Sequence, residues 1–304
     1  MKLPAVDTFN LSKNFGSVKA VSSLNLKVAQ GEIFGLVGPD GAGKTTIIKM
    51  LSGVMSPSEG NVKILGFDLI KEKNKVKPYI GYLSQQFTLY GDLTVDENLD
   101  FFAEIYETKN FKTKKDELLK FTRLTDFRKR LAEKLSGGMY KKLALACSLV
   151  HDPKIVFLDG PTTGVDVLSR RELWKIFDRL LKEGITIFIS TPYLDEAEKF
   201  SRVALINEGK LIALDSPYEI KKKFPFSILE VNASPIRDAY LLLKKFPNIL
   251  KVYIFGNSIH IEIDRLKINQ EKIKSFLFEN KIEVSEIREI LPSLEDTFIS
   301  LLSN

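Results

Sequence analysis

A glycine-rich segment is the part of this sequence whose residue types and spacing point most directly to chemistry. It follows the apolar run 33–37, which has the character of a buried strand, and it precedes 47–51, whose apolar spacing is typical of a helix. A loop in this position can curl so that successive N–H groups point inward, and the following helix adds its positive N-terminal end. The order strand, loop, helix therefore predicts a phosphate-binding site. The predicted phosphate-binding residues are Gly38, Pro39, Asp40, Gly41, Ala42, Gly43, Lys44, Thr45 and Thr46.

Three side chains suggest how such a site would work. Lys44 would reach the β- and γ-phosphates of a nucleotide, and the Thr45 hydroxyl would hold Mg²⁺. Asp159 ends the buried-strand pattern 154–159, where a carboxylate could contact a water molecule bound to the Mg²⁺. We therefore expect a nucleotide bound together with Mg²⁺.

A second segment could also bind an anion. Ser136, Gly137 and Gly138 open a predicted helix that runs to about Val150. Bare N–H groups, a hydroxyl and the helix dipole together favour negative charge at such a position. A helix that is simply well capped is the alternative interpretation.

Length and composition limit the possible classes of protein. The chain has 304 residues, enough for a domain of about 200 residues and a smaller one. Its contents of 44% hydrophobic and 28% charged residues are ordinary for a globular protein. The longest strongly apolar stretch, 143–150, is far shorter than the roughly 20 residues that cross a bilayer. No apolar segment typical of a signal peptide follows the N-terminus, so we expect a cytosolic protein.

Charge and cysteine content exclude two further classes. The net charge is +6, and the positive excess lies before Phe224 in lysine clusters such as 71–77 and 112–120. Aromatic residues are not interleaved with these lysines, so nucleic acid is not the expected partner. The chain has one cysteine, Cys147, so an internal disulfide is ruled out. Cys147 lies in an apolar helical pattern, which predicts a packed side chain.

Apolar patterns predict an α/β domain over residues 1–223. Buried strands alternate with helices, which indicates a largely parallel sheet with helices on both faces and the phosphate-binding loop at its carboxyl edge. A helical insertion of about 87–150 interrupts this order, and a capping box at Thr94–Glu97 opens its first helix. The other predicted elements are two strands within 5–30, strands at 61–65 and 79–84, a helix at 169–182, a strand at 185–190, a helix at 193–200, strands at 202–206 and 210–214, and a closing segment at 216–223.

Residues 224–304 form a separate predicted domain. The pattern has the order β-α-β-β-α-β, which indicates a small ferredoxin-like α+β module without evident chemistry of its own. The predicted elements are strand 226–232, helix 236–246, strands 249–255 and 258–264, helix 269–280 and strand 283–290.

Over residues 5–220 the chain resembles the nucleotide-binding subunit of an ATP-binding cassette (ABC) transporter, which has a P-loop NTPase fold. The glycine-rich loop matches the Walker A motif. The remaining matches are the signature motif at 135–139, with Met139 where glutamine is usual, Walker B at 155–159, the Mg²⁺-contacting glutamine at Gln85, the D-loop at 164–166 and the adenine-stacking aromatic at Phe15.

This resemblance implies a head-to-tail dimer that sandwiches ATP and Mg²⁺. Ser136, Gly137, Gly138 and Asp166 would serve the nucleotide held by the other ATP-binding subunit, which could be identical or different. Thr45, Gln85 and Asp159 would contact Mg²⁺. Closure on ATP would move separate transmembrane permease subunits, with this chain peripheral on the inner face of the cell membrane. The tail 291–298 resembles that of drug-exporter members, which favours export.

Two departures from the family pattern indicate a degenerate catalytic site. Gly160 stands where a glutamate orients the attacking water, and Pro192 stands where a histidine contacts the γ-phosphate. Neither residue offers an equivalent group, and loss of a water-positioning group lowers the rate by about 10²- to 10⁴-fold. His151 and His260 are poor substitutes, and no metal besides Mg²⁺ is expected.

Several functions are compatible with this pattern. The leading one is an exporter ATPase subunit, either in an asymmetric pair with a competent partner or as a slow homodimer. A second is a non-hydrolytic ATP-binding regulatory subunit that gates a partner. A soluble cassette acting on ribosomes or DNA is the third, and it would predict a second cassette or a long coiled-coil insertion, which this sequence lacks.

Overall fold

The computed structural model describes residues 3–86, 88–109, 111–264 and 270–302. Its contacts divide the chain into two compact units, Met1–Ser216 and Pro217–Asn304. The predicted closing segment, now helix α8 (Pro217–Lys222), groups with the second unit because it packs against that unit's last helix. The predicted starts of the insertion at residue 87 and of a helix at residue 269 lie outside the described residues.

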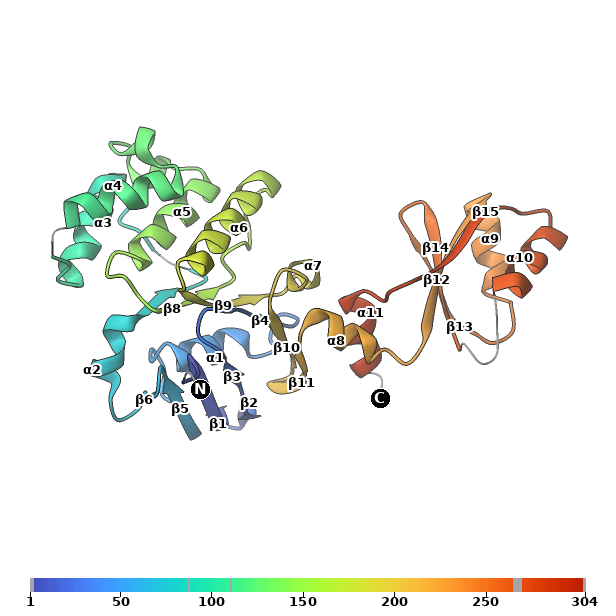
Figure 1. The fold of residues 1–304 in the computed structure, drawn as a ribbon, viewed down its shortest axis with the longest axis horizontal. Coiled ribbons are helices and arrows are strands. Elements are labelled where there is room, and N and C mark those ends of the chain that lie inside the picture. The colour runs from blue at the N-terminus through green and yellow to red at the C-terminus, as the bar shows by residue number, and fades with distance from the viewer. Residues whose placement is uncertain (1–2, 87, 110, 265–269, 303–304) are drawn as a thin grey trace. The chain divides into compact units, whose positions relative to one another are not determined.

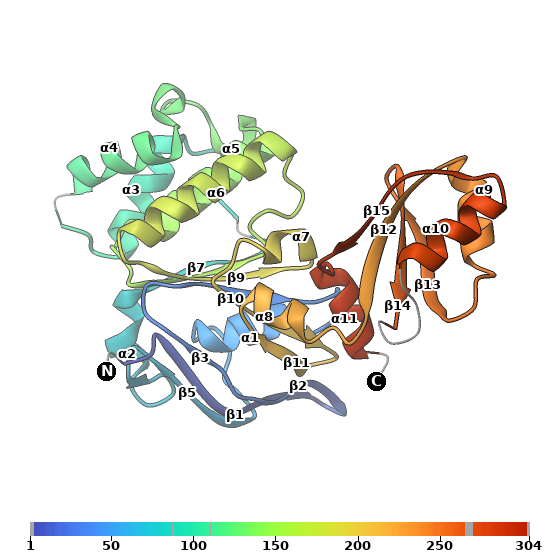
Figure 2. The ribbon, with the colours of Figure 1, turned by 45° about the vertical axis from the view of Figure 1, so that its right-hand side comes forward.

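The first unit contains two sheets, which Figures 1 and 2 show from two directions. The larger sheet has the order β11-β10-β4-β9-β8-β7, with β11 antiparallel and the other five strands parallel. This confirms the predicted, mostly parallel sheet. Its strands are β4 (Ile33–Val37), β7 (Ile80–Leu83), β8 (Ile155–Asp159), β9 (Thr186–Thr191), β10 (Arg202–Asn207) and β11 (Lys210–Asp215).

The smaller sheet is antiparallel and has the order β2-β1-β5-β6, with β3 also paired to β1. The sequence predicted two strands within 5–30, and the structure adds the short β3 there. The strands are β1 (Val6–Phe15), β2 (Val18–Leu24), β3 (Lys27–Val28), β5 (Glu59–Ile64) and β6 (Phe67–Asp68), and the short helix α2 (Lys73–Val76) follows them.

Helix α1 (Lys44–Leu51) lies between the two sheets (Figure 2) and belongs to the core of both. Its buried Ile47 and Met50 share one apolar cluster with Val6 of the small sheet and with Phe34 and Phe188 of the large one. Burial on both sides explains why this helix shows apolar residues on more than one face. The core therefore fixes the start of α1, and with it the glycine-rich loop.

Helices cover the remaining surfaces of the large sheet. The insertion consists of α3 (Val95–Ile105), α4 (Phe111–Thr122) and α5 (Gly137–Ser148), which lie together in Figure 1. Helix α6 (Val167–Lys182) packs on β9. The predicted helix 193–200 is shorter, because α7 spans Leu194–Ala197 and Phe200 then turns inward to pack against Trp174.

The second unit has the predicted β-α-β-β-α-β order in an antiparallel sheet ordered β13-β14-β12-β15. This arrangement is ferredoxin-like. Helices α9 and α10 and one face of the sheet form its apolar core. The elements are β12 (Ser227–Ser234), α9 (Ile236–Leu243), β13 (Ile249–Phe255), β14 (Ser258–Ile263), α10 (Gln270–Glu279), β15 (Glu283–Ile290) and α11 (Leu294–Leu302).

Candidate active site

A cleft of about 650 Å³ lies at the carboxyl edge of the large sheet. Parallel strands β4, β7, β8 and β9 end at this edge, so the residues that follow them converge there. Most residues singled out from the sequence for one nucleotide site are brought together in this way. The cleft is lined by Ala20, Asp40, Gly41, Gly43, Lys44, Thr45, Thr46, Gln85, Asp159, Gly160, Thr163, Ser190, Pro192 and Tyr193.

Lys44 is held against its own loop at the start of α1. Its ammonium donates hydrogen bonds to the carbonyl oxygens of Gly38 at 2.7 Å and Pro39 at 2.8 Å, and the residue is only 9% exposed. Burial lowers the pKa of Lys44, and the carboxylates of Asp40 and Asp159 counteract this shift. The cleft thus contains a buried amine positioned by backbone, which suits recognition of a phosphate group.

Asp159 is the buried carboxylate of the cleft, with 2% of its surface exposed. Its Oδ1 accepts a hydrogen bond from Ser190 Oγ at 2.5 Å, whereas Oδ2 is buried and has no hydrogen-bond partner in the described part of the chain. Burying a carboxylate oxygen without a partner is unfavourable. A cation or a cation-bound water molecule would satisfy this oxygen.

The other side chains near Asp159 fit Mg²⁺. Thr45 and Gln85 line the same cleft and carry a hydroxyl and an amide oxygen, the hard ligands that Mg²⁺ prefers. Within residues 3–86, 88–109, 111–264 and 270–302, no group of three or more His, Cys, Asp or Glu side chains could hold a metal ion. A small oxygen set of this kind is typical of Mg²⁺ that keeps several waters and substrate phosphates as ligands.

Gly160 and Pro192, which replace the family's glutamate and histidine, both line the cleft. Gly160 has a φ of +56°, a left-handed conformation that side chains rarely adopt. Pro192 offers neither a side-chain donor nor an N–H. The part of the cleft beyond Asp159 therefore carries neither a carboxylate at 160 nor an imidazole at 192.

Ser136, Gly137, Gly138 and Asp166 do not line this cleft but lie at the starts of α5 and α6. Ser136 caps α5 by accepting a hydrogen bond from the Met139 N–H at 3.3 Å. The serine and Gly137 are exposed, while Gly138 is buried because α6 passes close by. A Cβ on Gly138 would lie 2.1 Å from Ser169 Oγ.

Asp166 caps the neighbouring helix α6. Its Oδ1 accepts hydrogen bonds from the N–H groups of Leu168 and Ser169, both at 3.0 Å, and these contacts lower the pKa of its carboxyl group. The Gly138 Cβ position would be 3.6 Å from Asp166 Oδ2, so the two helix starts form one exposed surface.

Phe15 lies at the end of β1 and is 48% exposed. Lys13 Nζ lies 5.4 Å from the centre of its ring. Phe15 is not among the described residues that line the cleft, although Ala20 of β2, the strand paired to β1, is. Adenine stacking on Phe15 stays a prediction.

The sequence did not single out Thr163, Ser190 and Tyr193, which also line the cleft. Ser190 falls near the end of β9, and Thr163 lies in the loop after β8. Their positions just beyond or at the ends of neighbouring parallel strands were a signal that could have identified them. Tyr193, two residues beyond the end of β9, has the same signal, and the Arg170 guanidinium lies 4.7 Å from its ring centre.

Glu196 was also missed, and it connects the loops that border the cleft. It is 1% exposed, and its Oε2 accepts hydrogen bonds from the hydroxyls of Thr162 at 3.0 Å and Thr191 at 2.7 Å. Its Oε1 lies 3.7 Å from Nε of Arg170, on α6. One buried carboxylate therefore joins the loop after β8, the end of β9 and the first turns of α6.

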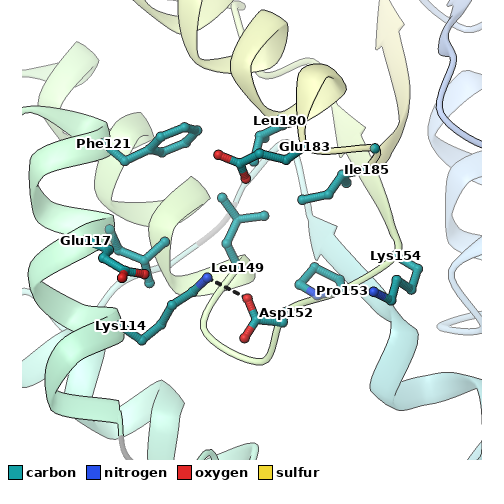
Figure 3. A pocket seen from close by; sticks show the side chains of 12 residues that line it. Lys114, Glu117, Phe121, Leu149, Asp152, Pro153, Lys154, Leu180, Glu183 and Ile185 are labelled. Atoms are coloured by element: carbon teal, nitrogen blue, oxygen red, sulfur yellow. Dashed lines mark ion pairs between the residues drawn. The ribbon is translucent and has the colours of Figure 1, made fainter.

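A second pocket, of about 380 Å³, lies at the amino ends of β8 and β9 (Figure 3). Leu149 and Leu180 form part of its apolar wall, and Lys114 of α4 pairs with Asp152 at 2.5 Å beside it. None of the predicted phosphate-binding residues lines it. The cleft at the opposite edge of the sheet is accordingly the candidate active site.

Comparison with known proteins identifies the family. Residues 21–163 match the model of the family described as ABC transporter. The chain is 36% identical to the bacitracin transport ATP-binding protein BcrA of Bacillus licheniformis, across 98% of this chain and 97% of BcrA. This chain belongs to the ABC transporter ATP-binding family.

Two further matches support this assignment, one across most of the chain and one across its C-terminal domain. The chain is 40% identical to the probable multidrug ABC transporter ATP-binding protein YbhF of Escherichia coli K12, over 98% of this chain but only 52% of YbhF. It therefore spans about half the length of that ABC protein. Residues 216–302 match the C-terminal domain of DrrA1-3-like ATP-binding proteins.

A solved structure supports the fold and the form in which such cassettes assemble. The dimeric, post-hydrolysis state of the ATP-binding cassette MJ0796, bound to ADP and phosphate, aligns with a TM-score of 0.63 at 26% identity. The alignment covers 69% of this chain and 98% of that cassette. The predicted P-loop fold is confirmed. In the described ranges of this ABC chain, no helix is long and apolar enough to cross a bilayer.

Proposed function

We propose that this chain is the ATP-binding subunit of an ABC exporter, in which ATP binding and hydrolysis drive separate membrane subunits. The observation that carries the proposal is the single cleft that joins Lys44, Thr45, Gln85 and Asp159, with Asp159 Oδ2 buried and unpartnered in the described part of the chain. The names of BcrA and YbhF, which refer to bacitracin transport and to a multidrug transporter, support export.

The residues of the cleft have distinct roles in this proposal. The loop N–H groups and Lys44 bind the β- and γ-phosphates, for which Lys44 exchanges its bonds to the loop carbonyls. Thr45, Gln85 and Asp159 hold Mg²⁺ and its water molecules. When bound, Mg²⁺ supplies positive charge next to the phosphates. Ser190 keeps Asp159 oriented through the 2.5 Å hydrogen bond, and Phe15 stacks on adenine.

The second ATP-binding subunit, identical or different, completes the site. Ser136, Gly137 and Asp166 are exposed at the starts of α5 and α6, Gly138 is buried beside them, and all four lie outside their own cleft. A head-to-tail dimer would place them against the nucleotide of the other subunit. Separate transmembrane permease subunits bind near Gln85 and the helical insertion, so the chain lies at the inner face of the cell membrane.

Hydrolysis in this cleft is expected to be slow. Gly160 and Pro192 supply no group to orient water or contact the γ-phosphate, and a lost water-positioning group lowers the rate by about 10²- to 10⁴-fold. Both losses fall on the same cleft, whereas the surface offered to the other subunit keeps its serine, glycines and aspartate. This pattern supports an asymmetric pair, in which this chain retains ATP and completes a competent site in its partner. A homodimer that hydrolyses ATP slowly is the alternative.

A non-hydrolytic regulatory subunit is the second candidate function, and the same two residues favour it. The two candidates share ATP binding and differ in turnover. They also differ in whether turnover responds to the membrane partner.

The test measures ATP binding and steady-state ATPase activity of the full chain, alone and with its membrane partner, beside Gly160→Glu and Gly160→Ala. ATP binding with slow turnover, accelerated by the glutamate and not by the alanine, would support the exporter subunit with a weakened site. Binding without turnover under any condition would favour the regulatory subunit. Failure to bind ATP would refute both, and turnover at a normal family rate would refute the weakened site.

A further inference from the structure

The loop after β8 has a fixed shape around Gly160. The Gly160 N–H donates to the carbonyl oxygen of Ser190 at 3.1 Å and to its hydroxyl at 3.0 Å. Thr163 returns toward this point, because its N–H donates to the Gly160 carbonyl at 3.1 Å. The turn thus places the side chain of Thr163 next to the Cα of Gly160.

The Thr163 hydroxyl occupies the space that a side chain at position 160 would enter. A Cβ built on Gly160 lies 3.0 Å from Thr163 Oγ1 and 3.7 Å from Gln85 Cγ. All three residues line the cleft. Apart from the adjoining residues 159 and 161, the atom nearest to a Cβ at position 160 is therefore the hydroxyl oxygen of a threonine.

The hydroxyls of Thr163 and Ser190 differ in their hydrogen bonds. Ser190 Oγ is already engaged, since it donates to Asp159 Oδ1 at 2.5 Å and accepts from the Gly160 N–H at 3.0 Å. Thr163 Oγ1 forms no hydrogen bond with any residue that the structure describes. It is free to bind a water molecule in the cleft.

We propose that Thr163 replaces the missing glutamate as the residue that orients the attacking water, with the Gln85 amide on the other side of that water. The inference rests on the proposed function. A neutral hydroxyl can accept a hydrogen bond from water but is too weak a base to remove its proton, which explains a slow rather than an absent reaction.

The proton lost by the attacking water is then accepted by the phosphate itself. The water oxygen forms a bond to the γ-phosphorus, and the bond from this phosphorus to the β,γ-bridging oxygen breaks. The electron pair of that bond leaves with ADP, and a water proton passes to an oxygen of the released phosphate. Thr163 stays protonated throughout and contributes orientation alone.

The test compares Thr163→Val, which has nearly the same shape, with Thr163→Ser, which retains the hydroxyl. We expect Thr163→Val to lower kcat by about 100-fold, the effect of a misplaced reacting group, with the Kd for ATP unchanged. Thr163→Ser should keep most of the parent kcat. The full chain is used, and thermal unfolding checks that each variant is folded.

A double-variant comparison separates water orientation from a structural role. When Thr163→Val is combined with Gly160→Glu, the carboxylate takes over the water, so the valine should have little further effect on kcat. Gly160→Ala has the same backbone strain as Gly160→Glu but no carboxylate, and on that background the valine should lower kcat as it does in the parent chain.

Three results would overturn the role of Thr163: an unchanged kcat in Thr163→Val, an equal loss of kcat on the Gly160→Glu background, or no turnover by the parent chain. ATP binding would survive each of them, and the proposed nucleotide site with it. Failure of the parent chain to bind ATP would instead reject the proposed function itself.

Discussion

Replacing Glu196 by alanine should strongly destabilise the first unit. This carboxylate is 1% exposed and joins Thr162, Thr191 and Arg170, which belong to three different elements. Removing it leaves two threonine hydroxyls without an acceptor and the Arg170 Nε without its carboxylate. Arg170 keeps its contact with Asp195 at 3.8 Å, and its buried Nε forms no hydrogen bond in the described part of the chain even with Glu196 present, so the two hydroxyls dominate the effect.

The size of the effect follows from the charge and burial of these contacts. Hydrogen bonds to a charged group stabilise a protein by about 1.5 to 3 kcal/mol each. Removing one partner from a buried charged network typically costs about 3 to 5 kcal/mol. We expect Glu196→Ala to lower the free energy of unfolding by that amount, and to lower the Tm by on the order of 10 °C.

Glu196→Gln should cost less. Its amide oxygen can still accept from Thr162 and Thr191, but its NH₂ group then faces Arg170 where Oε1 had been, 3.7 Å from Nε. A buried donor without a partner costs about 1 to 3 kcal/mol. The order of stability should therefore be parent, glutamine variant, alanine variant.

Tryptophan fluorescence during urea unfolding measures this effect in the right unit. The chain has one tryptophan, Trp174, which is 6% exposed on α6. Asp195→Ala is the matched control, since Asp195 also pairs with Arg170, at 3.8 Å, but is 73% exposed and should contribute at most about 1 kcal/mol. A loss below about 1 kcal/mol in Glu196→Ala would refute the assigned role of the network.

Three further predictions concern other buried contacts of the first unit. Gly138→Ala should cost about 1 to 3 kcal/mol through its clash with Ser169 and should be rescued by Ser169→Gly, as urea unfolding would measure. Burial raises the pKa of the Cys147 thiol, so a thiol reagent at pH 8 should react only after unfolding; reaction in the native state would contradict this. Burial also lowers the pKa of His151, whose ring stacks on Tyr106 at 3.9 Å. Below its unfolded pKa of about 6.5 the unfolded chain binds more protons, so stability should fall from pH 7 to pH 5, and less steeply in His151→Phe.

The sequence predicted those parts of the fold and site that depend on local pattern. The buried strand 33–37, the glycine loop and the start of α1 are contiguous, so residue order alone indicated a phosphate-binding loop. Six of its nine predicted residues line the cleft, and Gly38, Pro39 and Ala42 do not. Asp159 was singled out because it ends a buried-strand pattern, and it lines the same cleft. The β-α-β-β-α-β order of the second unit was equally local, and its sheet is confirmed.

Residues whose roles depend on tertiary contacts could not be found in this way. Glu196 lies in an acidic stretch that reads as a solvated helix face, and only the fold buries it beneath Thr162 and Thr191. Thr163 lies next to Gly160 only because the chain turns back there, with the Thr163 N–H donating to the Gly160 carbonyl. Helix α8 likewise groups with the second unit because it packs on α11. No sequence pattern near Ser216 predicts this packing.

The left-handed backbone at Gly160 also limits how a carboxylate could be regained at this position. A φ of +56° is nearly free for glycine but costs other residues roughly 1 to 3 kcal/mol, and the Cβ would lie 3.0 Å from Thr163 Oγ1, a close contact that requires a small shift of that side chain. A single codon change would thus gain a catalytic group and lose stability in the same step. Directed evolution toward fast turnover should select second substitutions in the loop between Gly160 and Thr163 before, or together with, the glutamate.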